Sequence, residues 1–391
     1  MRAASLHEPR ERMGVSHLLE HMVFKGTRRR SAKEIALSLE QLGGSLDAYT
    51  SREHTVYQAR VLDEHLEIAA DVIGDLVFEP VIRQADLDLE RNVILEEIGM
   101  VEDTPDDLVF ELHNTAVWGK HPLGYSILGT RDTVSALGVA ELKDLHRRAY
   151  RPSQLVVAAA GSVDHGELLE ILARTGWAER DAVKPRVPDV PPAAPLKQTR
   201  RHVKRDGSQT HIVIGSPTIG YHDKRRHAMV LLSAVLGGGM SSRLFQRVRE
   251  ELGLAYSVYT FQTFYAACGV HGVYVGTAPE TAEAALEAIQ SELAAVVAKG
   301  LLEEELNQGK GQLKGQITLS LESPTARMYR AAAVDLYGEP YRTLDEMLAL
   351  IEGIQADTIS ELARDFFDPT KQTVLSLGPD SARKRNGRAR R

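Results

Sequence analysis

The chain has 391 residues, 43% of them hydrophobic and 26% charged, which is the composition of a globular protein with two or three domains. Its net charge of −7 argues against a protein dedicated to binding nucleic acid or a membrane surface. The single cysteine, Cys268, excludes an internal disulfide and a cysteine-based metal site. With no apolar stretch typical of a secretory signal or a membrane span, the sequence predicts a cytoplasmic protein.

Segments with the periodicity of helices alternate with short runs rich in β-forming residues. The helix predicted at 32–42 is expected to end at Gly43-Gly44, because glycine is favoured just beyond a helix C-terminus. In chain order, helices are predicted at 32–42, 65–78, 84–100 and 106–118, and strands at 55–61 and 155–160. This alternation predicts an α+β fold in which helices and strands are interleaved.

The two halves of the chain contain the same landmarks in the same order. Pro152 and Gly161 are matched by a proline and a glycine 217 residues later, and Pro105 and Gly119 by the same pair of residue types 219 residues later. The pattern indicates two homologous domains. We therefore predict an N-terminal domain at 1–178, a Pro-rich linker at 179–200, a C-terminal domain at 201–382 and a basic, disordered tail at 383–391.

The strongest chemical signal is His17-Leu-Leu-Glu20-His21. On a helix, residues three and four apart project from one face, so the two imidazoles could hold Zn²⁺ and the glutamate could reach a water molecule beside it. This spacing is the inverted form of a common zinc-protease motif. The alternative is a pair of surface histidines on a charged helix.

A third ligand could come from the helix predicted at 84–100. Glu90 and Glu97 lie two helical turns apart on one face, next to Val93 and Ile94, so this face is expected to point inward. Carboxylates on an inward face need a partner, and a metal is one candidate. The alternative is an ordinary acidic, solvated helix.

These motifs resemble the sequence blocks of the insulinase/pitrilysin zinc metallopeptidases, in particular the processing-peptidase-like branch. Residues 14–27 resemble the zinc motif of that family. Further blocks that resemble it follow in family order at 43–57, 90–97, 122–129 and 237–256. The resemblance implies two homologous domains, each with a mixed, mainly antiparallel sheet packed against helices, that together form a two-part clamshell.

The resemblance also implies roles for individual residues in the first half. One Zn²⁺ per chain would be bound by His17, His21 and Glu97, with Glu20 as the catalytic general base and Glu90 as a supporting carboxylate. The enzyme would hydrolyse peptide bonds in peptides or unstructured polypeptide segments. Such a substrate would add as a strand along Asp47, Ala48, Tyr49 and Thr50.

The second half is expected to bind substrate and no metal. By resemblance, Arg249 and Tyr256 would bind the substrate carbonyl. In the internal repeat, the counterpart of His17 falls within Ala228–Val230 and that of Glu97 near Gln316, and none of these residues is a good zinc ligand, although His227 lies just outside the first window.

The start of the chain departs from the family pattern. Only sixteen residues precede His17, so the first strands of the N-terminal sheet are expected to be missing, through either a late start assignment or a real truncation. The alternative function is therefore a non-catalytic or truncated partner subunit of a processing-peptidase-like complex. A homodimer, or a pair with a related subunit, is the family-based expectation.

Overall fold

The computed structural model describes residues 1–177, 190 and 192–380. The described residues divide into two compact units, which we treat separately. Most of the predicted linker at 179–200 and all of the predicted tail at 383–391 lie outside the described residues. Within the described part, no helix is both long and apolar enough to cross a membrane.

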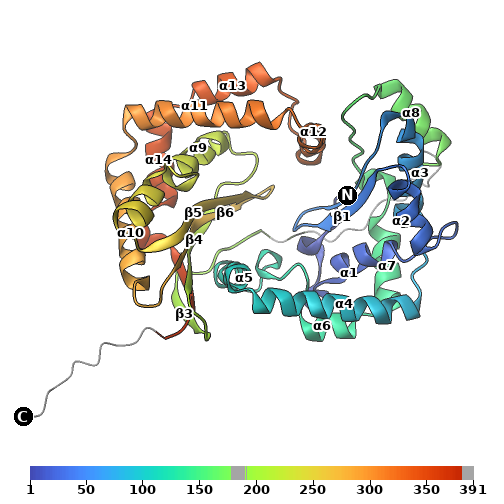
Figure 1. Cartoon of the computed structure of the whole chain (residues 1–391), viewed down its shortest axis with the longest axis horizontal. Helices are drawn as coiled ribbons and strands as arrows, with labels where there is room; N and C mark the ends of the chain where they lie inside the picture. The colour runs from blue at the N-terminus through green and yellow to red at the C-terminus, as the bar shows by residue number, and fades with distance from the viewer. Residues whose placement is uncertain (178–189, 191, 381–391) are drawn as a thin grey trace, which may run out of the picture. The chain divides into compact units, whose positions relative to one another are not determined.

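The first unit comprises Met1–Val101, Lys120–Pro192 and Ser323–Gly338. Among its described residues, β1 and β2 form an antiparallel two-stranded sheet in which Ser45 pairs with Arg60 and Thr50 with Thr55. Its strands and helices are β1 (Ser45–Thr50), β2 (Thr55–Arg60), α1 (Val15–Val23), α2 (Ala32–Glu40), α3 (Leu66–Phe78), α4 (Gln84–Asp103), α6 (Arg131–Ala136), α7 (Val139–Ala149), α8 (His165–Arg174) and α12 (Pro324–Tyr337) (Figure 1).

The second unit comprises Glu102–Gly119, Ala193–Glu322 and Glu339–Arg391. Its sheet has the order β3-β7-β4-β6-β5, with β3 parallel to β7 and the other pairs antiparallel, so it is mixed and mainly antiparallel as predicted. Its strands and helices are β3 (Arg200–Lys204), β4 (Thr210–Thr218), β5 (Ala255–Phe264), β6 (Gly269–Thr277), β7 (Thr373–Gly378), α5 (Pro105–Trp118), α9 (Arg226–Gly237), α10 (Ala282–Lys299), α11 (Glu303–Ser320), α13 (Leu344–Glu352) and α14 (Ala356–Phe366).

Both faces of the five-stranded sheet are covered. Successive side chains of a strand point to opposite faces, so each strand contributes residues to two cores. Along β4, Ile212 and Ile214 belong to the large core that includes residues of α9, α10 and α14, whereas Val213 belongs to the core on the opposite face. That second face is covered by α5, through buried Val109 and its neighbours. The mixed α+β architecture predicted from the sequence is confirmed.

Two helices are exchanged between the halves of the sequence. α5 precedes the linker in the chain but packs in the second unit, whereas α12 follows the linker but packs in the first. In the first unit, the Tyr329 hydroxyl of α12 donates to Gln58 Oε1 (2.7 Å) and the Tyr337 hydroxyl donates to Glu53 Oε2 (2.9 Å). The two helices are counterparts in the internal repeat, since each begins at the matched proline and ends before the matched glycine.

The strand predicted at 155–160 is wrong, because among the described residues this segment forms no β-strand and Val157 is exposed. Its counterpart in the repeat is β7, which is held between β3 and β4. A strand requires a neighbour that accepts and donates its backbone hydrogen bonds. In the described part of the first unit, no strand lies beside 155–160 to supply them.

Candidate metal centre

The candidate centre is built on α1, a helix with two distinct faces. Leu18, Leu19 and Met22 point into the core of the first unit and are fully buried. His17 and His21 lie one helical turn apart on the opposite side. The burial of the apolar face therefore fixes the helix in the orientation that presents both imidazoles together.

The start of α1 is held by a buried carboxylate. Glu8 accepts hydrogen bonds from the backbone N–H groups of Gly14 (2.8 Å) and Ser16 (2.7 Å), which have no partner within the helix. Burial raises the pKa of Glu8 to about 7, while these hydrogen bonds oppose the rise. Gly14 has φ +89° and passes so close to the Leu128 carbonyl that a Cβ there would lie 2.5 Å from its oxygen, so the turn requires glycine.

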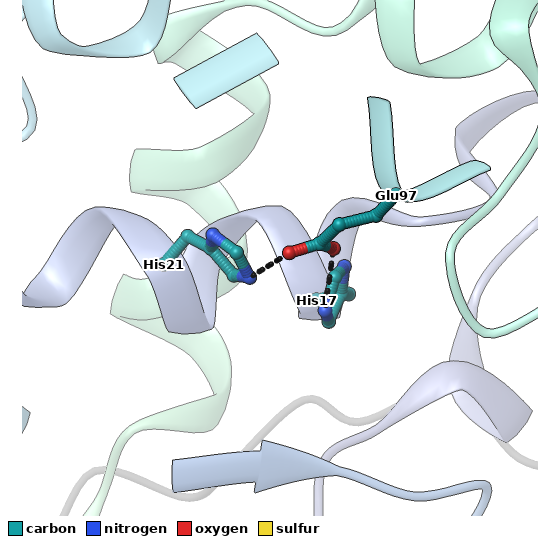
Figure 2. Close-up of side chains that lie close together, drawn as sticks. All are labelled: His17, His21 and Glu97. Atoms are coloured by element: carbon teal, nitrogen blue, oxygen red, sulfur yellow. Dashed lines mark ion pairs between the residues drawn. The ribbon is translucent and has the colours of Figure 1, made fainter. Parts of the chain in front are cut away.

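Glu97 reaches the two histidines from α4. Its Oε2 lies 3.7 Å from His17 Nε2, and its Oε1 lies 3.7 Å from His21 Nε2. Figure 2 shows both ion pairs as dashed lines. The ligand atoms of the three residues all lie within 4.8 Å of one another. Among the described residues, this is the one group of three or more histidine, cysteine or acidic side chains close enough to share a metal.

The three side chains fit a zinc ion. Two imidazole nitrogens and a carboxylate oxygen form a common catalytic zinc set, and ligands about 2 Å from a tetrahedral ion lie roughly 3.3 Å apart, close to the separations found here. Burial, helped by the neighbouring His21, lowers the pKa of His17 to about 3. His17 is therefore neutral at physiological pH, the form that binds metal.

Glu90 lies behind His21, on the same face of α4 as Glu97. Its Oε2 is 3.1 Å from His21 Nδ1, the ring nitrogen that points away from Glu97. Its Oε1 is 2.6 Å from the Lys25 ammonium. Glu90 therefore contacts a candidate ligand from behind, as expected for a supporting carboxylate.

Glu20 lies on the same side of α1 as His17 and His21 and is buried, with 6% of its surface exposed. The Thr50 hydroxyl donates a hydrogen bond of 2.5 Å to Glu20 Oε2. Burial raises the pKa of Glu20, and the Glu97 charge adds to the rise, whereas the Thr50 hydrogen bond and His21 oppose it. A raised carboxyl pKa suits a group that must take up and release a proton near neutral pH.

Two tyrosines near Glu20, the half-buried Tyr57 and the buried Tyr150, contact each other. The hydroxyls of Tyr57 and Tyr150 lie 2.7 Å apart. Burial raises the pKa of both phenols, and the Glu20 charge raises it further. Both phenols therefore stay neutral and can donate hydrogen bonds.

The four residues expected to bind substrate as a strand all lie on β1. Asp47 and Ala48 pair with Gln58 and Tyr57 of β2, and among the described residues the other edge of β1 has no paired strand. Thr50 has an additional contact that its position in the motif did not predict, the hydroxyl bond to Glu20.

Tyr49 of β1 takes part in a small aromatic group. Its ring centroid lies 6.2 Å from that of His54 and 6.2 Å from that of Tyr329 in α12. The side chain of Tyr49 is partly exposed. The predicted substrate strand is therefore accompanied by a residue from the second half of the sequence.

Arg249 and Tyr256 lie together in the second unit. Arg249 is carried by a π-helix, Phe245–Glu251, and Tyr256 by the adjoining strand β5. The guanidinium carbon lies 4.8 Å from the Tyr256 ring centroid and 4.7 Å from that of Phe245. The structure therefore brings the two predicted residues together and adds Phe245. The signal for Phe245 in the sequence was its position four residues before Arg249. π-Helical turns are frequent at functional sites.

The residues that the internal repeat makes counterparts of the first-half ligands lie on helices of the second unit. The window Ala228–Val230, predicted to correspond to His17, lies in α9, where Ala228 and Met229 are buried in the apolar core. Gln316 lies in α11. Sequence reasoning missed Lys25 and the Thr50 hydroxyl, and the one signal for Lys25 was its place four residues after His21.

Comparison with protein families and known proteins gives a consistent result. Residues 2–131 match the model of the insulinase family (peptidase family M16), and residues 136–313 match that of the peptidase M16 inactive domain. A zinc protease of Streptomyces coelicolor, itself described as uncharacterized, is 41% identical over 94% of this chain and 81% of its own length. One from Bacillus subtilis, described in the same way, is 38% identical over 95% of this chain and 90% of its own length.

Solved structures share the fold. A peptidase M16 inactive domain from Pseudomonas fluorescens matches with a TM-score of 0.89 and 23% identity, over 98% of this chain and 92% of that one. A protease from Helicobacter pylori matches with a TM-score of 0.91 and 20% identity, over 97% and 92% of the two chains. At these identities the likeness is one of fold.

Proposed function

The chain belongs to the insulinase family of zinc proteases, peptidase family M16, and on that premise we propose that it is a zinc-dependent endopeptidase. The observation that carries the proposal is the convergence of His17, His21 and Glu97 with a buried, hydrogen-bonded Glu20 beside them. Two imidazoles and one carboxylate leave a coordination position open for reaction, as in catalytic rather than structural zinc sites.

The chemistry assigned to the chain's own residues is general base catalysis. Zn²⁺, when held by the three ligands, supplies the Lewis acidity that activates a water molecule and polarises the scissile carbonyl. Glu20 takes the proton from the attacking water and delivers it to the leaving amine. Burial raises the pKa of Glu20, which makes its carboxylate a stronger base for the first step, and the Thr50 hydroxyl holds one carboxylate oxygen so that the other can face the water.

The proposed substrate is a peptide or an unstructured polypeptide segment. The edge of β1 that is unpaired within the described residues offers backbone groups to an extended chain, which is strand addition to a sheet edge. Binding through main-chain groups depends little on side chains, so cleavage-site preference is expected to be broad. We assign carbonyl binding in the substrate to Arg249 and Tyr256, whose stacked side chains both carry hydrogen-bond donors.

The test is cleavage of an unstructured, internally quenched fluorescent peptide by the purified chain. We expect about one zinc per chain, loss of cleavage on chelation and recovery when zinc is restored. Glu20→Gln keeps the shape of the side chain and removes the base, so it should lower kcat by at least about a hundredfold while zinc content is unchanged.

The matched control is Glu40→Gln, which makes the same change at an exposed position of α2. It should cleave as fast as the wild type. Cleavage at the wild-type rate by Glu20→Gln would exclude the proposed mechanism. A zinc-loaded, folded wild-type chain that cleaves no peptide would instead favour a non-catalytic subunit.

A further inference from the structure

Lys25 lies just beyond the end of α1 and contacts Glu90, the carboxylate that in turn contacts His21. Its ammonium is 2.6 Å from Glu90 Oε1, and the other oxygen of the same carboxylate is 3.1 Å from His21 Nδ1. The three side chains therefore form a continuous line, from α1 to α4 and back to the turn that follows α1. His21 and Lys25 are four residues apart, so one helical turn separates the two groups that Glu90 bridges.

Glu90 is in a position where its orientation depends on its partners. Only 8% of its side-chain surface is exposed, and a buried carboxylate is costly unless its charge and lone pairs are satisfied. Lys25 provides a full positive charge to one oxygen, which leaves the other to accept from the imidazole. Both oxygens are thus engaged, and the plane of the carboxylate is fixed.

The two candidate histidine ligands differ in this respect. His21 has Glu90 behind it, whereas His17 Nδ1 is buried with no hydrogen-bond partner among the described residues. No hydrogen bond at Nδ1 therefore orients the ring of His17. The ring of His21 depends on a hydrogen bond that aims Nε2 at Glu97, and so on whatever holds Glu90.

We propose that Lys25 is a positioning residue of the metal centre, which holds Glu90 so that its free oxygen orients His21 for zinc binding. The inference rests on the proposed zinc site and adds to it a residue that never touches the metal. Loss of such an outer partner typically costs 10- to 100-fold in metal affinity, and because Lys25 acts through Glu90 we expect about tenfold.

The test measures zinc affinity directly, without reference to peptidase activity. Apoprotein is titrated with zinc in competition with a chromophoric chelator. Lys25→Met keeps the length of the side chain and removes the charge, and should weaken zinc binding about tenfold. Lys25→Arg restores a cation and should stay within about threefold of the wild type. Lys33→Met, the same change at an exposed lysine of α2, should bind as the wild type does.

A double-mutant cycle separates positioning from a general structural role. If Lys25 acts through Glu90, then Glu90→Gln/Lys25→Met should bind zinc no more weakly than Glu90→Gln alone. If the Met variant fails to fold, Lys25→Gln, whose amide can still donate to Glu90, replaces it in the cycle. Additive losses would contradict the proposal, because they would mean that Lys25 stabilises α1 independently of Glu90.

The outcomes also separate this inference from the proposed function. A folded wild-type chain that binds no zinc overturns both. A wild-type chain that binds zinc tightly, with Lys25→Met and Lys25→Gln within twofold of it, overturns only the role of Lys25. A graded series from Arg through Gln to Met, abolished by Glu90→Gln, supports the proposal.

Discussion

At the residue scale, the candidate centre depends on polar side chains that each hold another side chain in place. Thr50 holds Glu20, Glu90 holds His21, and Lys25 holds Glu90. A hydrogen bond to a charged group contributes about 1.5–3 kcal/mol, and it also selects one rotamer of its partner. We therefore expect removal of these supporting groups to weaken the site without unfolding the chain.

Thr50→Val tests the support of the general base. It replaces the hydroxyl with a methyl group of similar size, so Glu20 Oε2 loses its donor. We expect kcat/KM for peptide cleavage to fall about tenfold, since about 1.4 kcal/mol corresponds to a factor of ten. Zinc content should not change. Thr318→Val in α11, which removes a hydroxyl bonded to the Lys314 carbonyl, should leave kcat/KM unchanged; an equal fall in both variants would count against the role of Thr50.

His17→Ala tests the metal site through stability. Zinc that binds only the folded chain stabilises it by about 2.7 kcal/mol at a free concentration of a hundred times Kd. Added zinc should therefore raise the unfolding temperature of wild-type apoprotein and leave that of His17→Ala unchanged. His165→Ala, at an exposed position on α8, should respond as the wild type does. A zinc-dependent rise in His17→Ala would show that zinc binds elsewhere.

The sequence predicted the residues that could bind the metal, but not the contacts that hold those residues in place. Residues three, four or seven apart on a helix share a face whatever the rest of the chain does, so spacing made His17, His21, Glu90 and Glu97 candidates, and the family resemblance supplied their roles. The Lys25–Glu90 and Thr50–Glu20 contacts join separate elements. They depend on how helices and strands pack, which local spacing does not determine.

At the element scale, α5 shows how much a helix can contribute to a sheet that lies far from it in sequence. Its buried residues include His113, whose imidazole faces β4 so closely that a Cβ on Gly215 would lie 2.9 Å from its Cε1. Burial lowers the pKa of His113 to about 4, against the effect of backbone groups of Thr373 and Gly215. Burial also lowers the pKa of His271 on β6 to about 4.

These histidines predict acid sensitivity of the second unit. The unfolded chain takes up a proton at each histidine near pH 6.5, whereas the folded chain does so near pH 4. Between these values the unfolded state binds more protons, so stability is complete above pH 6.5 and is lost as the pH falls toward 4. Each histidine should cost about 2 kcal/mol at pH 5 relative to pH 7.5, measured by urea unfolding.

His113→Gln isolates one of the two contributions. Glutamine does not titrate, so the loss of unfolding free energy between pH 7.5 and pH 5 should be about 2 kcal/mol smaller than in the wild type. The comparison is made within each protein, so a lower stability of the variant at both pH values does not affect it. An unchanged loss would mean that His113 does not titrate as its burial predicts.

Helices were predicted more accurately than strands, for a physical reason. The helices predicted at 65–78, 84–100 and 106–118 are found within a few residues of those bounds, because a helix satisfies its own backbone hydrogen bonds. The segment 155–160 has the composition of a strand and no strand partner in the described part of the first unit. The π-helix that carries Arg249 has no sequence signature in residues 245–251 that would separate it from an α-helix.

At the scale of the whole molecule, the exchange of α5 and α12 makes each unit depend on both halves of the sequence. α5 fully buries Val109, Val117 and Trp118, and burial of each large apolar side chain stabilises by roughly 1.5–3 kcal/mol. A fragment that ends at residue 177 keeps α5 but loses the sheet that α5 covers. Neither the repeat nor the linker composition predicted this exchange, since both are properties of the chain and not of its packing.

Separately expressed fragments test this dependence. Residues 1–190 and 191–391 should each be aggregation-prone alone, because an apolar helix or an apolar sheet face is left uncovered. Expressed together, they should co-purify as a 1:1 complex that binds zinc. Soluble, cooperatively unfolding monomers of both fragments would contradict the expectation. Cutting the full chain within the predicted linker offers a control that starts from assembled protein.

The packing of α5 also means that one of its partner strands is synthesised long after the helix itself. The helix is complete at Trp118, but it covers β7, which begins at Thr373 and is the last strand among the described residues. At roughly 5–20 residues per second, the ribosome needs on the order of tens of seconds to add the intervening chain. During that time α5 can pack against β4 but not against β7, so part of its apolar side stays uncovered and the nascent protein is expected to need a chaperone until β7 emerges.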